Sequence, residues 1–430
     1  MRILNYQSDK KQLEKIIKNR DFEIEEKLRS KVKKILLNIK NKGDEAVFDF
    51  TAKFDQVELD SLKVSKKEIN SAIELVEKDF LDSLKRSAKN IRDFHEKQKE
   101  ESWLDTEKGK MTGQLINPIK RVGCYVPGGG AAYPSSALMT VIPAQAAGVE
   151  EIVVTTPPDN NGRVNPYTLA ALNQLGVSEI YKVGGAQAIA SLAYGTESIK
   201  KVQKVVGPGN IFVTIAKKEL YGYVDIDMLA GPSEIMILAD ENADADYLAA
   251  DLLSQAEHDP RAISILVSPS LKLIEKVKKE IEKQLKALSR KEVAGQSLKD
   301  NGFLIEVKNI EAGLELVNDY GPEHFELAVE DPLSYLGQIQ NAGAVFLGEY
   351  SPEPLGDYFA GPNHVLPTGG TAKYASPLTT NDFFKKTSII YYSQQALKSC
   401  AQDIIQIANK EGLDAHAKAV EIRKRGDSFE

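Results

Sequence analysis

Residues 121–147 read RVGCYVPGGGAAYPSSALMTVIPAQAA, and this stretch decides the fold. It opens with a short apolar run, 122–126, passes through a glycine-rich turn, and continues into a longer apolar segment, 135–147. A short β-rich run, a turn and a segment of helical length are typical of one strand–helix unit of an α/β fold. The rest of the chain repeats this unit.

The repeats fall into two series of expected strands and helices. Strands are expected at 122–126, 151–155, 180–183 and 202–206, and then at 235–239, 263–267, 303–307 and 344–347. Helices are expected between them at 135–147, 166–175, 186–194, 211–220, 245–256 and 271–288. Such alternation requires right-handed crossovers and therefore predicts mostly parallel sheets covered by helices. Two series predict two α/β units.

The flanking segments have a different pattern. Residues 9–99 place apolar side chains at three- and four-residue spacing among Lys and Glu, which predicts packing helices. Ser65 and Glu68 have the spacing of a capping box at the start of one such helix. A Pro/Gly-rich passage, 351–377, is followed by a helical pattern from about residue 378, which suits a small appendage that reaches a partner subunit.

Length, charge and cysteine usage limit the class of protein. A chain of 430 residues is too long for one compact core, so two main domains are expected. The formal charge of -7 is spread along the chain, and no basic stripe indicates nucleic-acid binding. Two distant cysteines, Cys124 and Cys400, do not predict a disulfide framework. Without an amino-terminal apolar run or a membrane-length segment, we expect a cytoplasmic protein that does not bind membranes.

The five histidines are scarce enough for each to be informative. His95 stands in the charged segment DFHEKQKE, where we expect an ordinary solvated side chain. Gln255 and His258 are three residues apart near the end of a predicted helix, so both side chains can point to one face before Pro260. The simpler interpretation of this pair is a polar helix end.

A metal site is the alternative interpretation of that pair. Zinc and similar metals use imidazole together with carboxylate or carbonyl oxygen, and they leave a position open for substrate. Asp357 and His416 have the right chemistry to complete such a set. Their spacing along the chain does not show that they converge.

Glu323 and His324 follow Gly321 and Pro322, which places them on a loop or at a helix start. Adjacent residues cannot share a helix face, but on a turn both can border one cavity, where they would transfer protons near neutral pH. The competing interpretation is a helix amino terminus that favours Glu electrostatically.

Two glycine-rich turns follow predicted strands, one at 127–130 and one at 207–210. Each precedes a predicted helix, whose free backbone N–H groups suit a cofactor phosphate. Neither turn has the G-x-G-x-x-G spacing, so the standard dinucleotide fingerprint is absent. Cys124 lies beside the first turn, where we expect a small buried side chain and no thiohemiacetal chemistry.

Taken together, these segments resemble the histidinol dehydrogenase family. The resemblance covers residues 120–425 in the family's order, whereas the first hundred residues match only in general character. It is carried by GCYVPGGGAAYPSSALM, VGGAQAIASLAYGTESI, KVVGPGN, DMLAGPSEIMILAD, DLLSQAEHDP, NDYGPEHFEL, GAVFLGEYSPEPLGDYFAGPNHVLPT and GLDAHAKAVEIR.

The resemblance implies a role for each matching position. Catalysis is implied for Glu323 and His324, and NAD contacts for Tyr125, Gln187 and Asn210. The implied zinc ligands, one ion per subunit, are Gln255, His258, Asp357 and His416. The implied substrate contacts are Ser233, Gln255, His258, His324, Asp357, Glu411 and His416.

The family also implies a fold and an assembly. Two incomplete Rossmann-like domains with mostly parallel sheets are expected, with small helical segments at both ends of the chain. The expected division is an amino-terminal segment 1–24, a first domain 25–124 plus 233–377 with the metal and catalytic residues, a second domain 125–232 with the NAD contacts, and a carboxy-terminal segment 378–430. In an intertwined homodimer, that last segment would complete the neighbour's site.

The expected activity is the zinc-dependent oxidation of L-histidinol to L-histidine through L-histidinaldehyde with two NAD+, the last two steps of histidine biosynthesis. One alternative is a related zinc- and NAD-dependent amino-alcohol or sulfonate dehydrogenase on the same scaffold, for which Glu411 and the surrounding pocket would decide the substrate. Another is a non-catalytic metabolite-binding protein with a structural metal.

Overall fold

The structure is a computed structural model that describes residues 1–18, 26–128 and 132–425. Backbone contacts divide the chain into two units, each of which is described by itself. The first unit comprises 1–98 and 120–382, and the second comprises 99–119 and 383–430. None of the helices in the described ranges is long and apolar enough to cross a membrane.

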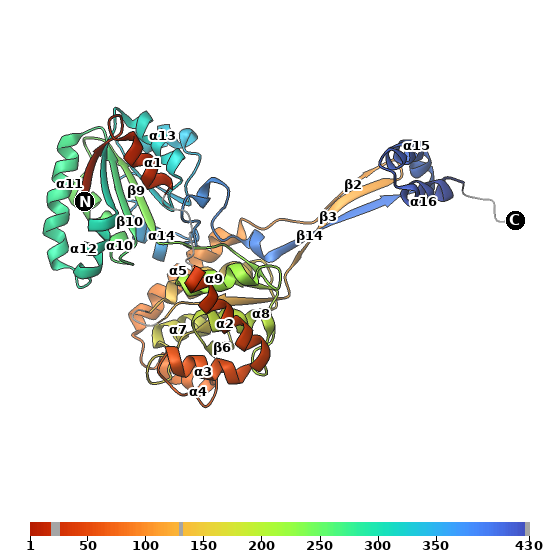
Figure 1. Ribbon diagram of the computed structural model, residues 1–430, viewed down its shortest axis with the longest axis horizontal. Coiled ribbons are helices and arrows are strands. Elements are labelled where there is room, and N and C mark those ends of the chain that lie inside the picture. The colour runs from red at the N-terminus through yellow and green to blue at the C-terminus, as the bar shows by residue number, and fades with distance from the viewer. Residues whose placement is uncertain (19–25, 129–131, 426–430) are drawn as a thin grey trace. The chain divides into compact units, whose positions relative to one another are not determined.

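A six-stranded, entirely parallel sheet forms one half of the first unit (Figure 1). Its strands, in spatial order, are β1 (Arg2–Asn5), β11 (Gly302–Glu306), β10 (Ile263–Ser268), β9 (Glu234–Ala239), β12 (His324–Ala328) and β13 (Ala344–Leu347). Every residue of β9 is buried, as expected for a central strand whose two faces are both covered by helices.

Helices cover both faces of this sheet. One face packs on α10 (Ala245–Ala256), α11 (Leu271–Gln284) and α12 (Lys291–Asn301), and the other on α1 (Lys10–Lys18) and α13 (Ile310–Tyr320). Successive residues of β9 alternate between the two apolar clusters, because strand side chains point to opposite faces in turn. The core therefore fixes the position of β9, beside which the candidate site lies.

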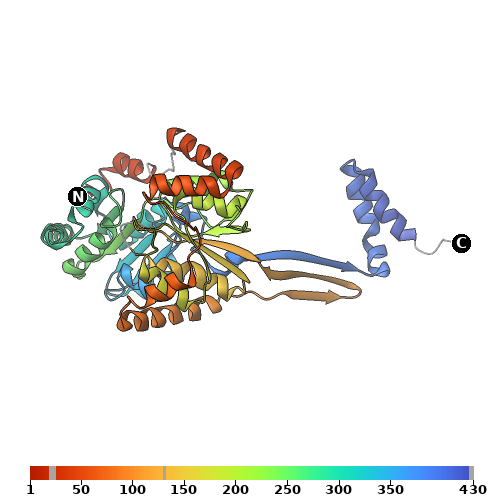
Figure 2. The same ribbon diagram turned by 90° about the horizontal axis from the view of Figure 1, so that it is seen from below.

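A five-stranded parallel sheet forms the other half of the first unit. Its strands, in spatial order, are β6 (Glu179–Lys182), β5 (Glu151–Thr156), β4 (Arg121–Tyr125), β7 (Lys204–Val206) and β8 (Asp225–Ile226). One face is covered by α2 (Glu26–Lys42), α3 (Asp44–Phe54), α8 (Gly185–Tyr194) and α9 (Ile211–Leu220), and the other by α4 (Lys66–Ile73), α5 (Lys78–Glu96), α6 (Pro134–Ala146) and α7 (Pro166–Gln174) (Figure 2).

These two parallel sheets confirm the expected α/β fold class. All eight expected strands are present, with bounds that differ by at most two residues. The helices α2 and α3, which the sequence analysis grouped with the metal and catalytic residues, instead pack on α8 and α9 of the five-stranded sheet. An amphipathic helix shows which of its faces is buried but not which partner covers it. The division into four segments itself stays a prediction.

The second unit contains a sheet that the sequence analysis did not predict. Its strands β2 (Trp103–Glu107), β3 (Lys110–Pro118) and β14 (Phe384–Tyr392) are antiparallel, in the order β14-β3-β2. The helices α15 (Gln394–Lys410) and α16 (Asp414–Arg425) follow β14. The expected helical pattern from about residue 378 is therefore wrong over β14, whose β-branched and aromatic residues favour a strand.

The capping box at the start of α4 is confirmed. The Ser65 hydroxyl accepts the Glu68 N–H at 3.2 Å, and the Glu68 carboxylate accepts the Ser65 N–H at 2.7 Å. Two of the free N–H groups at the helix start are thus bound by side chains.

His95 is not solvated, so the expectation for this residue is wrong. Its side chain is fully buried, with Nδ1 2.7 Å from Gln98 Oε1 and Nε2 3.3 Å from Asn363 Nδ2. Desolvation lowers the pKa of His95, and the hydrogen bond to Gln98 opposes this change only in part. The buried ring therefore favours its neutral form.

His95 should make the stability of the first unit depend on pH. The unfolded chain binds a proton at His95 below its ordinary pKa of about 6.5 while the folded chain resists it, so stability falls as pH falls below that value, by up to about 1.4 kcal/mol per pH unit. We predict that His95→Gln reduces the drop in Tm between pH 7.5 and pH 5. An unchanged drop would contradict this assignment, and Lys97→Gln, at an exposed position two residues further along the chain, is the control.

Candidate active site

Glu323 and His324 stand at the start of β12. Gly321 ends α13 in the left-handed conformation, with φ 63° and ψ 65°, and Pro322 then leads directly into the strand. The expectation of a loop or helix start is therefore wrong for His324, which pairs in register with Ile235 of β9. A Gly-Pro pair indicates only that the preceding helix ends. The next element can be a loop, a helix or a strand.

One residue of β9 holds both of these side chains. The Glu234 N–H donates to Glu323 Oε2 at 2.8 Å, and the Glu234 carbonyl oxygen lies 3.0 Å from His324 Nδ1. A carbonyl oxygen only accepts, so this contact assigns the proton to Nδ1 and leaves the lone pair on Nε2. Nε2 is buried and has no hydrogen-bond partner within the described ranges.

Burial shifts the pKa of both groups towards their neutral forms. Desolvation raises the pKa of Glu323 well above its ordinary value, and the nearby carboxylates of Glu234, Asp357 and Glu353 raise it further, against the Glu234 N–H. Desolvation also lowers the pKa of His324, against the opposite effect of Asp357. A neutral imidazole with a free Nε2 lone pair is able to accept a proton from a substrate.

A group of metal-ligating side chains lies beside this pair. Ligand atoms of His258, Glu353 and Asp357 all lie within 4.8 Å of one another, and Glu353 Oε1 is 3.8 Å from His324 Nε2. His258 follows the end of α10, whereas both carboxylates come from α14 (Glu353–Tyr358). Burial, followed by the repulsion of Asp357, raises the pKa of Glu353 well above its ordinary value. A bound cation would relieve this repulsion.

Gln255 lies in the last turn of α10, and its backbone carbonyl oxygen accepts the His258 N–H at 3.2 Å. Its side chain is 1% exposed, and no hydrogen-bond partner for Oε1 is found among the described residues. An amide oxygen buried without a partner is costly unless something binds it. Amide oxygen, imidazole and carboxylate together form a donor set that fits zinc, so the residues present fit the expected ion.

Glu353 was missed by the sequence analysis, although its spacing was informative. Glu353 and Asp357 are four residues apart, so they share a face of the short helix α14. His364 also supports the site without having been given a role, because its Nδ1 lies 3.1 Å from the Asp357 carbonyl oxygen and 3.6 Å from the Asp357 carboxylate. It therefore fixes the segment that carries Asp357.

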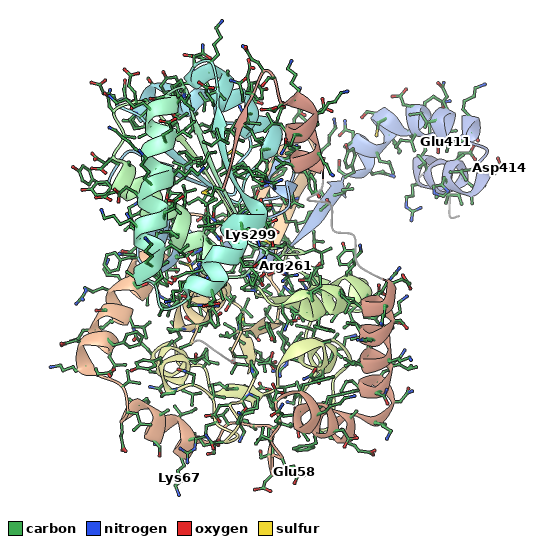
Figure 3. All side chains as sticks on the ribbon, turned by 60° about the vertical axis from the view of Figure 1, so that its left-hand side comes forward. Glu58, Lys67, Arg261, Lys299, Glu411 and Asp414 are labelled. Carbon is green, nitrogen blue, oxygen red and sulfur yellow. The ribbon has the colours of Figure 1, made fainter. Side chains whose placement is uncertain are left out.

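The expected substrate contacts lie in both units. Ser233 immediately precedes Glu234, and its carbonyl oxygen accepts the Ile263 N–H at the start of β10. Glu411 follows α15 and His416 lies in the first turn of α16, so both belong to the second unit (Figure 3). Both side chains are exposed. Their participation in the site stays a prediction.

The expected NAD contacts all lie at the carboxyl edge of the five-stranded sheet. Tyr125 ends β4, and its hydroxyl accepts the Gly185 N–H at 3.2 Å, which links it to the helix that carries Gln187. Asn210 caps α9, where Oδ1 accepts the N–H groups of the second and third helical residues. Ligands of open parallel sheets bind outside this edge, at the point where the strand order reverses.

The second glycine-rich turn lies against β4. Gly207 has φ +114°, and a Cβ at this position would stand 2.1 Å from the Tyr125 carbonyl oxygen, so only glycine fits. Of the first turn, Gly128 lies against Pro157, whereas Gly129 and Gly130 are outside the described residues. The turn after β7 therefore lies against the end of β4, and Gly128 lies against the segment that follows β5.

The six-stranded sheet has a separate pocket at its own carboxyl edge. The pocket has a volume of about 630 Å³, and its lining includes Asp240, Asp251, Glu326, Glu330 and Tyr350. None of the expected site residues lines it. Glu323 and His324 instead lie at the amino end of their strand, on the opposite edge of the sheet.

Cys124 is a small buried side chain, as the sequence analysis expects. The side chain is fully buried, and burial raises the pKa of its thiol to about 12. This environment disfavours the thiolate that nucleophilic attack requires.

The fold and the site define an α/β protein that has a buried carboxyl–imidazole pair beside a set of side chains able to bind a metal ion. Comparison with known proteins specifies the class further. The chain belongs to the histidinol dehydrogenase family of NAD-dependent oxidoreductases, whose family model matches residues 18–424.

Curated relatives and a crystal structure agree with this assignment. A histidinol dehydrogenase of Bacillus thuringiensis subsp. konkukian is 53% identical over 93% of each chain. One of Caldanaerobacter subterraneus subsp. tengcongensis is 53% identical over 96% of each chain. The crystal structure of histidinol dehydrogenase from Elizabethkingia anophelis matches with a TM-score of 0.93 and 38% identity, covering 99% of this chain and 97% of that one.

Replacing the buried amide of Gln255 tests the metal site. We predict that Gln255→Leu, which keeps the side-chain volume but removes Oε1, weakens zinc binding about tenfold or more because one oxygen ligand is lost. The measurement is the zinc retained after dialysis against graded chelator. Gln296→Leu, at an exposed position on α12, is the matched control and should retain zinc like the unchanged protein. Equal retention by both variants would exclude Gln255 as a ligand.

Proposed function

We propose that the chain oxidises L-histidinol to L-histidine through L-histidinaldehyde, with water and two NAD+ consumed and two NADH formed. The observation that carries this proposal is the pair Glu323 and His324, held by the peptide groups of Glu234 beside the metal-ligating side chains. The reaction needs a base for an alcohol, a base for water, and a site that retains the aldehyde. These residues match each need.

His324 is the base for the first oxidation. With Nδ1 bound to the Glu234 carbonyl oxygen, the Nε2 lone pair is the only ring position left to accept the substrate's hydroxyl proton. Burial keeps the ring neutral and therefore ready to accept. Its position on a strand between two other strands limits movement, which preserves the alignment of base and hydroxyl.

Glu323 is the base for water in the second oxidation. Its carboxylate removes a proton from water as the water attacks the aldehyde carbon, and the protonated His324 returns its proton to the former carbonyl oxygen, which gives the gem-diol and leaves His324 neutral again. His324 then accepts a hydroxyl proton from the gem-diol, as it did from the alcohol. Because burial raises the pKa of Glu323, a larger fraction of the carboxylate form is present as pH rises, which favours this step in alkaline solution.

Gln255, His258 and Asp357, with His416 of the second unit, are the proposed zinc ligands, and Glu353 lies close enough to assist them. Bound zinc would orient the imidazole and amino nitrogens of the substrate. Tyr125, Gln187 and Asn210 are the proposed contacts for NAD+, which would accept one hydride in each oxidation. Ser233 and Glu411 are proposed to bind the substrate.

A second copy of this chain is the proposed partner. The second unit has a small core of its own, chiefly Ile405, Ala408 and Ala417, and it exposes a large apolar surface. The exposed side chains include Trp103, Leu104, Ile390, Tyr391, Ile407 and Ile422. An exposed surface of this kind is typical of an interface between subunits. We further propose a cytoplasmic location, which suits a biosynthetic enzyme whose two cysteines are both free.

Separating the two oxidations tests both the activity and the division of roles. The zinc-loaded chain should form two NADH per L-histidinol, and fewer would contradict the proposal. We predict that Glu323→Gln lowers the rate of L-histidinaldehyde oxidation about 100-fold but that of histidinol oxidation less than about tenfold, because only aldehyde oxidation requires water activation.

Glu326→Gln is the matched control for that variant. Glu326 is another buried carboxyl on the same strand, and it accepts the Glu353 N–H at 2.8 Å. Neutralising it should affect both oxidations to the same extent. Equal losses in both oxidations for Glu323→Gln as well would contradict the assigned role.

Mixing two variants that are each impaired in aldehyde oxidation tests whether subunits share a site. Glu323→Gln alters the first unit and His416→Asn the second, so a hybrid dimer with exchanged second units contains one site with both native residues. We predict that an equimolar mixture, refolded or coexpressed, regains about a quarter of the activity of the unchanged protein in aldehyde oxidation. No recovery in hybrids isolated by two affinity tags would show that each chain completes its own site.

A further inference from the structure

Lys217 and Asp227 form an ion pair inside the first unit that the proposed reaction does not use. Lys217 Nζ lies 2.6 Å from Asp227 Oδ1, and the two side chains are 4% and 0% exposed. Lys217 belongs to α9, whereas Asp227 directly follows β8. The desolvation of two buried charges offsets much of their attraction, so such a pair is a poor source of stability.

Both polar groups of Gly207 are bound by this ion pair. The Gly207 carbonyl oxygen accepts from Lys217 Nζ at 2.6 Å, and the Gly207 N–H donates to Asp227 Oδ2 at 2.7 Å. The turn 207–210 therefore cannot rotate about its first residue without breaking charge-assisted hydrogen bonds, which are roughly twice as strong as neutral ones.

The bound turn lies between two of the proposed NAD contacts. On one side, Gly207 lies against the Tyr125 carbonyl oxygen without room for a Cβ. On the other side, Asn210 follows three residues later and caps α9 through Oδ1, at 3.0 and 3.3 Å from the N–H groups of Phe212 and Val213. The Oδ1 of Asn210 is thus engaged, and its Nδ2 remains as a donor.

We propose that Lys217 and Asp227 are positioning residues for the nucleotide cofactor. Together they fix the turn 207–210, so that Tyr125 and Asn210 keep the spacing that binding requires. The inference rests on the proposed NAD site at these residues. The pair is electrically neutral and Lys217 is committed to two acceptors, so its contribution is geometric and does not arise from attraction of a phosphate.

A second ion pair provides a control within the same sheet. Lys204 and Asp225 are the first residues of β7 and β8, and Lys204 Nζ lies 3.0 Å from Asp225 Oδ2. Lys204 is 7% exposed in its side chain, so its burial is similar to that of Lys217. This pair joins β7 and β8 at their amino ends, away from the turn 207–210, which follows the carboxyl end of β7.

The experiment compares Lys217→Met, Asp227→Asn and Lys204→Met in the full-length, zinc-loaded chain. We expect the first two to raise KM for NAD+ about tenfold or more, while kcat at saturating NAD+ and KM for histidinol change less than about twofold. Lys204→Met should leave KM for NAD+ within about twofold of the unchanged protein. Equal effects of Lys204→Met and Lys217→Met, or parallel losses in all three constants, would overturn the proposal.

Asp227→Asn also separates positioning from direct phosphate binding. If Lys217 bound a cofactor phosphate, removal of the neighbouring negative charge would lower KM for NAD+, whereas loss of the clamp raises it. A lower KM in this variant would therefore overturn the proposal.

Amide hydrogen exchange provides a readout that does not depend on activity. Peptides that cover 207–210 should exchange faster in Lys217→Met and Asp227→Asn than in Lys204→Met, measured without cofactor. If the unsubstituted protein forms no NADH, the proposed function fails. The role of Lys217 and Asp227 in fixing the turn is still tested separately, because it fails if exchange in these peptides is the same in the variants as in the unsubstituted protein. If NADH is formed but neither KM for NAD+ nor exchange changes, only the clamp fails.

Discussion

The candidate site depends on the N–H and the carbonyl oxygen of one residue, Glu234. Both groups face β12, where the ladder of paired residues ends at Ile235 and His324. Beyond that point the N–H and the C=O of Glu234 are bound by the side chains of Glu323 and His324 instead of by another strand. The orientation of the Glu323 and His324 side chains, and the tautomer of the histidine, are therefore consequences of sheet pairing. Any shift of β12 relative to β9 would therefore change both orientations and the histidine tautomer together.

This dependence explains why so much of the fold was predictable from sequence and so little of the site geometry. Parallel strands covered on both faces appear as short apolar runs between helices, so eight strands could be predicted within two residues of their bounds. The strand that carries His324 was missed because it begins with polar residues after a Gly-Pro turn. His258 and Asp357 are almost a hundred residues apart, and only the fold brings their ligand atoms close to Glu353. Resemblance to a family identified these residues before geometry did.

The remaining errors share a physical cause, which is that tertiary burial is not encoded by local pattern. His95 stands among charged residues, yet its side chain is buried beside Asn363 from a distant segment. Glu353 has an ordinary spacing from Asp357 on a short helix, but its place beside His258 and its raised pKa follow from burial in the folded chain. β14 was interpreted as helical because its nine residues do not alternate clearly between apolar and polar side chains. Its partner β3 lies far away in the sequence, so no nearby turn indicates the pairing. Each case depends on contacts between segments that are distant along the chain.

The proposed NAD site would meet the backbone requirements of nucleotide binding without the dinucleotide fingerprint. A turn that binds a nucleotide must bring backbone close to the ligand and must present a fixed helix start. In this chain Gly207 makes the close approach, Asn210 rather than glycine begins the helix, and a buried Lys–Asp pair holds the turn. The holding residues lie ten and twenty positions beyond Gly207, so no compact motif records them. The G-x-G-x-x-G pattern identifies one way to hold a turn close to a ligand. A buried ion pair from distant parts of the chain, such as Lys217 and Asp227, can hold a turn as well, and no short motif includes it.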